Sequence, residues 1–218
     1  MKRTVFPAMY LVVIIFYLCS AVTSAQDLKS IKLPDPQMTG GRPLMEVLKD
    51  RCSTREFSSE KLSPQVLSNL LWAAFGINRP ESGKRTAPSA VNWQEIDIYV
   101  ATAEGLYLYD AKGNMLQPIL AGDIRADTGT QEYVKDAAVN LIYVGDYSRI
   151  GRGTDEYKTR TSTWDTGFIS QNVYLFCASE GLATVVRGLV DRPVLSKIMK
   201  LSPDQNITLT QSVGYPKK

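Results

Sequence analysis

Three side chains that can bind phosphate stand at alternate positions early in the chain. Arg51, Ser53 and Arg55 point to the same side if this segment is extended, because side chains alternate across an extended chain. Two guanidinium groups and a hydroxyl then offer charge-assisted, partly bidentate hydrogen bonds to a phosphate dianion. The alternative is a solvated charged loop after a helix, and on spacing alone it is the more common explanation.

A second segment, residues 88–94, has the composition of a loop that lies against a planar ring. Pro88, Ser89 and Ala90 are small and allow close approach of the backbone. The amide of Asn92 can both donate and accept, which suits the edge of a planar ring that carries carbonyls and ring nitrogens. The alternative is a plain loop that leads into a strand, with Trp93 in the core.

A third segment combines a helix end with two glycines. Gly181 follows a long apolar helix, a short strand comes next, and Gly188 stands seven residues later. Gly188 can bring its backbone close to a ligand. An ordinary connection between a helix and a strand explains the same pattern.

The chain of 218 residues contains no histidine. This composition excludes Ser-His-Asp and Cys-His nucleophile systems and the metal sites that need histidine. An enzyme of this composition uses other side chains or a cofactor that carries the chemistry. The net charge is +3 and the basic residues are dispersed, so nucleic acid is not an expected partner. The cysteines lack metal-site spacing, and no metal site is predicted.

The N-terminus has the pattern of an export signal. Lys2 and Arg3 precede an apolar stretch at residues 8–22, and small residues at 23–25 offer a cleavage site. An uncleaved anchor is the alternative, but the stretch is shorter than the roughly 20 residues that a membrane span needs. We therefore expect a signal peptide at 1–25, a linker at 26–42 and one domain at 43–218. The mature protein is expected to be periplasmic or secreted and not to bind membranes. Cys52 and Cys177 remain after cleavage; they either pair, or Cys177 is a buried thiol on an apolar helix face.

The apolar periodicity of residues 43–218 predicts an α+β domain with long helices against a sheet. Ser63 and Pro64 are typical of a helix start, and Gly76 of its end. Further helices are expected from Pro43, at 163–180 and from Asp191. Strands are expected at 95–101, 106–109, 115–119, 139–144, 183–186 and 207–213, with a hairpin at 110–114 and a buried central strand at 139–144.

Taken in order, these segments resemble the nitroreductase family from about Pro43 to Pro216. The resemblance rests on residues 51–55, the helix start at 62–64, the segment 87–94, the helix end at 178–182 and the closing segment 212–216. Residues 71–78 and 85–90 look most like the branch that contains the azoline-oxidising peptide dehydrogenases.

The resemblance implies a nitroreductase-like fold, with a mainly antiparallel central sheet flanked by helices. It also implies a homodimer with one FMN per subunit, bound at the interface. The implied reaction is ping-pong hydride transfer to or from a small organic substrate, with NADH or NADPH as a possible reductant. The FMN-binding residues that it implies are Arg51, Cys52, Ser53, Arg55, Pro88, Ser89, Ala90, Asn92, Gly188 and Lys217. Arg55 matches the basic position at the pyrimidine edge of the flavin, where a cation stabilises the reduced anion, so it is the candidate catalytic residue.

Two departures from the family pattern concern the phosphate and the reductant. Many members carry a basic pair well beyond the Gly-Tyr-Pro-like segment, whereas this chain ends at Lys217 and Lys218, which either replace that pair or leave a weaker clamp. Export would also separate the protein from cytoplasmic NADH and NADPH. A flavin-binding protein without turnover and a degenerate interaction domain are the alternative functions.

Overall fold

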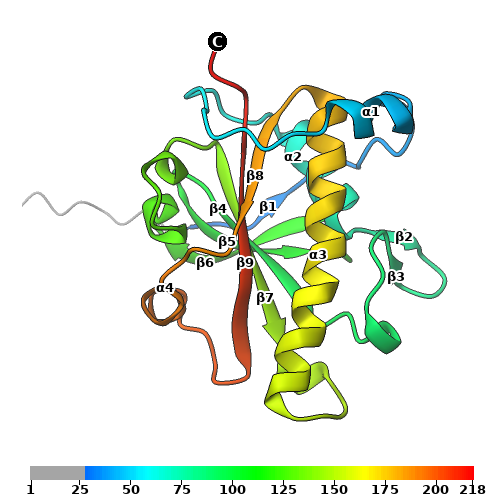
Figure 1. Ribbon diagram of the computed structural model, residues 1–218, viewed down its shortest axis with the longest axis vertical. Coiled ribbons are helices and arrows are strands. Elements are labelled where there is room, and N and C mark those ends of the chain that lie inside the picture. Colours follow the sequence, from blue (N-terminus) through cyan, green and yellow to red (C-terminus); the bar gives the residue numbers. More distant parts are fainter. Residues whose placement is uncertain (1–27) are drawn as a thin grey trace, which may run out of the picture.

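The computed structural model describes residues 28–218, and the expected signal peptide lies outside the described residues. Its centre is a seven-stranded sheet in the order β1-β6-β5-β4-β7-β9-β8, in which each neighbouring pair is antiparallel (Figure 1). The strands are β1 Ile31–Lys32, β4 Ile96–Ala101, β5 Gly105–Asp110, β6 Met115–Ala121, β7 Val139–Asp146, β8 Ala183–Arg187 and β9 Gln205–Gly214, while β2 Ile77–Arg79 and β3 Lys84–Arg85 form a separate ribbon. The helices are α1 Leu44–Asp50, α2 Pro64–Phe75, α3 Asp155–Glu180 and α4 Arg192–Met199. The predicted α+β class and mainly antiparallel sheet are confirmed.

The two faces of the sheet are covered by different helices. In β7, Leu141 and Tyr143 pack in the cluster that contains α2 and α3, whereas Ile142 and Val144 pack in the cluster that contains α4. This division follows from the alternation of side chains along a strand. The central position predicted for β7 is confirmed, since it pairs with β4 and β9 and is buried along nearly its whole length. Figure 1 shows α3 running lengthwise across the sheet, with α4 away from it.

Helix α3 begins at Asp155, eight residues before the expected start at Thr163. The side chain of Thr154 accepts a hydrogen bond from the Tyr157 N–H, and Asp155 and Glu156 follow in the first turn. A cap and acidic residues favour a helix N-terminus even where apolar periodicity is weak, which is why the apolar pattern alone placed the start too late. Gly181 ends the helix in the left-handed conformation, as predicted.

Ser63 caps α2 as predicted, and its hydroxyl accepts a hydrogen bond from the Val66 N–H. Of the apolar side chains of α1, Val47 is buried, while Leu44 and Leu48 are exposed.

Part of the segment expected to be a linker packs on the domain. β1 pairs with β6, and Leu33 is buried in the core. Ser68 of α2 also donates a hydrogen bond to the Pro34 carbonyl at 2.6 Å. Residues 31–34 are therefore docked on the sheet edge and α2.

Cys52 and Cys177 are both free, Cys52 exposed and Cys177 buried. Burial raises the pKa of the Cys177 thiol, as expected for an inert thiol in an apolar setting. Of the two explanations for these cysteines, the structure favours the buried thiol. Within residues 28–218, no helix has the length and apolar character needed to cross a membrane.

Candidate functional site

The segment after α1 brings Arg51 and Ser53 against one tyrosine of α3. The Ser53 hydroxyl lies 2.7 Å from the Tyr174 hydroxyl, and the Arg51 guanidinium carbon lies 5.3 Å from the centre of the Tyr174 ring. The Thr54 N–H donates to the Thr184 carbonyl at 3.0 Å, which holds the segment against β8. The alternation predicted from the sequence therefore places the first two of the three side chains on the same side.

Tyr174 joins three elements of this region. Its hydroxyl accepts a hydrogen bond from the Val186 N–H of β8 at 3.0 Å and bonds to Ser53. Its side chain is buried, with 7% of the residue exposed. Tyr174 was missed in the sequence because a tyrosine in an apolar helix carries no signal of what its hydroxyl touches. It fixes the position of Ser53 relative to the sheet.

Replacement of Tyr174 by phenylalanine is expected to weaken both the fold and the site. The Val186 N–H loses its acceptor, which costs about 1–3 kcal/mol of unfolding free energy for a buried group left without a partner. Ser53 also loses its anchor, and the affinity for the FMN that the resemblance implies should fall several-fold. Chemical denaturation and flavin-fluorescence titration measure the two effects.

Tyr147→Phe is the matched control. It removes a hydroxyl that bonds to Thr159 at 2.8 Å in another part of α3. It should lower stability without changing FMN affinity. Equal losses of affinity in the two variants would show that Tyr174 acts only through global stability.

The other residues predicted for the phosphate end lie along the same chain segments. Arg55 is exposed two residues beyond Ser53, and the exposed Cys52 lies with its sulfur 3.6 Å from the Thr54 hydroxyl. Gly188 directly follows β8, and its carbonyl accepts from the Arg192 guanidinium at 3.2 Å.

The segment predicted to line the flavin ring is held at a different position on α3. The Ala90 N–H donates to the Asp165 carboxylate at 2.8 Å. Asp165 precedes Tyr174 by nine residues, which is about 13 Å along the helix axis. Within this loop Pro88 and Asn92 are exposed, while Ser89 is half-buried and accepts from the Gln94 N–H at 3.0 Å. The structure therefore separates the residues predicted to line the ring from those predicted to bind the phosphate.

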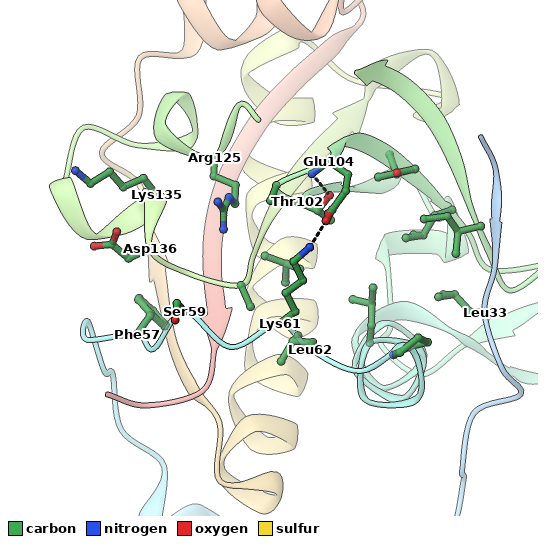
Figure 2. A pocket seen from close by; sticks show the side chains of 18 of the residues that line it. Leu33, Phe57, Ser59, Lys61, Leu62, Thr102, Glu104, Arg125, Lys135 and Asp136 are labelled. Atoms are coloured by element: carbon green, nitrogen blue, oxygen red, sulfur yellow. Dashed lines mark hydrogen bonds and ion pairs between the residues drawn. The ribbon is translucent and has the colours of Figure 1, made fainter. Parts of the chain in front are cut away.

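A cavity of about 710 Å³ lies in a third place, between the segment before α2 and the turn joining β4 to β5. Figure 2 shows Lys61 reaching across to Glu104, with which it forms an ion pair, and Arg125 pointing toward the same space. The floor is apolar and includes Leu33 and Leu62. Of the predicted site residues only Lys217 lines this cavity, and its N–H donates to the Glu56 carbonyl at 3.3 Å. The cavity is therefore distinct from the region of Arg51, Ser53 and Tyr174.

Residues 48–215 match the sequence profile of the nitroreductase family. The chain belongs to this family. It is a family of flavin-dependent oxidoreductases, and the matched range contains Arg51, Ser53, the loop 88–94 and Gly188.

Individual relatives agree with this assignment. A protein of Methanocaldococcus jannaschii, named as a candidate nitroreductase, is 31% identical over 185 residues, covering 80% of this chain and 91% of its own. The crystal structure of a candidate nitroreductase from Ralstonia eutropha superposes with a TM-score of 0.84 at 40% identity, covering 91% of this chain and 93% of the other. A candidate nitroreductase from Desulfovibrio desulfuricans, solved in complex with FMN, shares the fold at 20% identity with a TM-score of 0.59, covering 82% of this chain and 89% of its own.

Proposed function

We propose that this protein is an FMN-dependent oxidoreductase that passes hydride or electrons, through bound flavin, to or from a small organic substrate. The observation that carries the proposal is the convergence of the Arg51 guanidinium and the Ser53 hydroxyl on Tyr174, beside the end of β8. Such a pair suits a phosphate, because a guanidinium offers charge-assisted donors and the hydroxyl a further hydrogen bond.

The residues present fit FMN at both of its ends. Arg51 and Ser53 would hold the phosphate and ribityl chain, with Cys52 beside them. Lys217 lines the cavity of Figure 2, so its side chain would have to turn out of that cavity for it, or Lys218, to add a further cation. Gly188 would offer backbone without a side chain in the way. Pro88, Ser89, Ala90 and Asn92 would line the ring. The flavin supplies the redox chemistry, which explains how an enzyme can dispense with histidine.

Arg55 would act on the chemistry through its charge. A cation beside the N1 and C2 carbonyl edge of the ring stabilises negative charge as it develops there. The side chain is exposed, so it is free to meet a ligand. Arg55 would therefore favour reduction of the bound cofactor without itself exchanging protons.

The proposal is tested by an absorbance spectrum of the purified protein incubated with FMN, followed by anaerobic addition of NADH or NADPH and then of a nitroaromatic or quinone acceptor. Bound flavin that is reduced and reoxidised supports an enzyme. Bound flavin that neither donor reduces supports a flavin-binding protein without turnover. A colourless protein supports a degenerate interaction domain and rejects the proposal.

We further propose a homodimer that buries exposed apolar side chains of α1 and α3. Met45 of α1 is 76% exposed, and Trp164 and Phe168 of α3 are also exposed. Large exposed apolar side chains of this kind are typical of a subunit interface. The exposed apolar surface on this longest helix is larger than a monomer is expected to leave in contact with water.

The dimer predicts a large effect of charge at this surface. Trp164→Glu should weaken self-association at least tenfold, because an unpaired carboxylate would have to be buried. Val194→Glu, at an exposed apolar position of α4, is the matched control and should leave the dimer intact. Light scattering across micromolar concentrations measures both. A flavin-loaded wild-type monomer at these concentrations would refute the dimer.

Two finer proposals rest on the sequence. Export to the periplasm or medium rests on residues 1–25, and mass spectrometry of the N-terminus from the native host tests it; an intact N-terminus would refute cleavage.

Placement in the branch of azoline-oxidising peptide dehydrogenases rests on residues 71–78 and 85–90. Turnover of azoline-containing peptides by the purified holoprotein tests that placement, and no turnover would count against it.

A further inference from the structure

Two acidic side chains are buried together beneath the loop 88–94. Glu95 is 0% exposed and Asp165 is 3% exposed. Neither oxygen of the Glu95 carboxyl has a hydrogen-bond partner, and Asp165 is the neighbouring acid whose charge acts on Glu95. Within residues 28–218, neither acid forms an ion pair with a lysine or arginine. Two buried carboxylates in contact repel each other unless a proton lies between them.

This pair is joined directly to the loop. Asp165 accepts the Ala90 N–H, and the Asp146 N–H donates to the backbone carbonyl of Glu95 at 2.9 Å. The loop also has backbone strain, because Val91, Asn92 and Gln94 all have positive φ angles near 50°. Each such non-glycine residue costs about 1–3 kcal/mol and persists only where surrounding contacts hold it. The contact between Asp165 and Ala90 is one of those that hold it.

The cationic groups around the loop have partners other than the two acids, and the Arg152 guanidinium carbon lies 5.9 Å from the centre of the Trp93 ring. Arg149 donates to the Gln94 carbonyl at 2.9 Å and pairs with Asp97 and Asp146. Arg85 donates to the Gln94 side chain at 2.8 Å. The hydroxyl of Ser162 is the further polar group beside Glu95. The described neighbours therefore give this pair no cation, and the Ser162 hydroxyl beside Glu95 has no hydrogen-bond partner of its own.

We propose that Glu95 and Asp165 share one proton, and that the protonated pair positions the loop 88–94 for the flavin through the Ala90 N–H. Glu95 is thus a positioning residue, and loss of the shared proton leaves two repelling charges under a strained loop. The inference rests on the proposed function, because it takes this loop to be a flavin contact.

The direction of the pH dependence follows from burial. Desolvation, strengthened by the charge of Asp165, raises the pKa of Glu95 to about 7, against 4.5 for an unperturbed glutamate. The folded protein therefore binds this proton more tightly than the unfolded chain does. The stability that Glu95 contributes is present below about pH 4.5 and is lost as the pH rises through about 7.

The test compares wild type with Glu95→Gln between pH 6 and 8.5. The amide of glutamine stays neutral and can donate to Asp165, so the variant imitates the protonated pair. The melting temperature of the wild-type apoprotein should fall relative to that of the variant as the pH rises. The wild-type Kd for FMN should rise about three- to tenfold relative to that of the variant over this range, because FMN binding to the positioned loop favours the protonated form of Glu95.

Comparison between variants cancels the titration of the ligand itself. A phosphate monoester has its second pKa near 6, so the clamp should bind FMN more tightly as the pH rises in each protein. Glu104→Gln is the matched control, because it makes the same substitution at an exposed acid paired with Lys61. Glu104→Gln should keep the wild-type pH dependence of both the melting temperature and the Kd for FMN. If Glu95→Gln does not fold, Asp165→Asn relieves the same repulsion and retains an oxygen to accept from Ala90.

The possible results separate three hypotheses: the shared proton, the positioning of the loop and the proposed function. Parallel melting curves of wild type and the amide variants would overturn the shared proton. Different melting curves with parallel FMN curves would overturn the positioning of the loop. Failure of every protein to bind FMN would refute the proposed function instead, while the melting curves would still test the shared proton.

Discussion

Replacement of Arg51 by alanine is expected to remove most of the bound FMN. A hydrogen bond to a charged group contributes about 1.5–3 kcal/mol, which corresponds to a loss of affinity of roughly 10- to 150-fold. Arg51 does not act alone, since Ser53 bonds to the same tyrosine that the guanidinium covers. Quenching of flavin fluorescence during titration of the apoprotein measures the loss.

The control for this variant removes a cation elsewhere. Lys135 is exposed at the cavity of Figure 2, away from Tyr174. Lys135→Ala lowers the net charge by the same amount and should change FMN affinity little. Unchanged affinity in Arg51→Ala would remove Arg51 from the phosphate site. Equal losses in both variants would indicate a long-range effect of net charge. Both binding measurements should be repeated at high salt, because contacts between exposed charges weaken as ionic strength rises.

Much of the fold could be predicted from local patterns. The cap at Ser63, the glycine end of α3 and the buried run of β7 are each encoded by neighbouring residues, and the structure confirms them. The early start of α3 was missed because its first turns are polar and are held by the cap at Thr154 rather than by an apolar face. Docking of residues 31–34 was missed because β1 is only two residues long and shows no periodicity.

The candidate site was only partly predictable because its contacts join distant segments. Alternation along residues 51–55 placed Arg51 and Ser53 on the same side, but nothing near them indicates Tyr174, which is 121 residues from Ser53. The pair of Glu95 and Asp165 was likewise missed, since a single acid in a strand or helix pattern is ordinarily an exposed residue. Only the packing of α3 across the sheet brings each pair together.

Replacement of Arg55 by glutamine is expected to lower the reduction potential of the bound flavin. If Arg55 lies beside the N1 and C2 carbonyl edge, its charge favours the anionic reduced ring over the neutral oxidised ring. Glutamine keeps a hydrogen-bond donor and removes the charge. For a two-electron couple about 30 mV corresponds to roughly 1.4 kcal/mol, so a shift of that order is expected. Reduction by NADH or NADPH should slow in parallel, and stopped-flow absorbance measures that half-reaction.

A second role for Arg55 makes a different prediction, which lets one pair of variants separate the two. If Arg55 is only another phosphate ligand, Arg55→Gln weakens FMN binding but leaves the potential of the remaining holoprotein unchanged. Arg55→Lys keeps the charge and loses the planar fork of donors. Under the electrostatic role, Arg55→Lys should have a reduction potential close to that of the wild type. Under the phosphate role, neither variant changes the reduction potential. Spectroelectrochemistry on holoprotein saturated with FMN measures the potential independently of affinity. A potential that is the same in wild type and Arg55→Gln would reject the electrostatic role, because removing a full charge beside the ring must change the relative free energies of its two redox states.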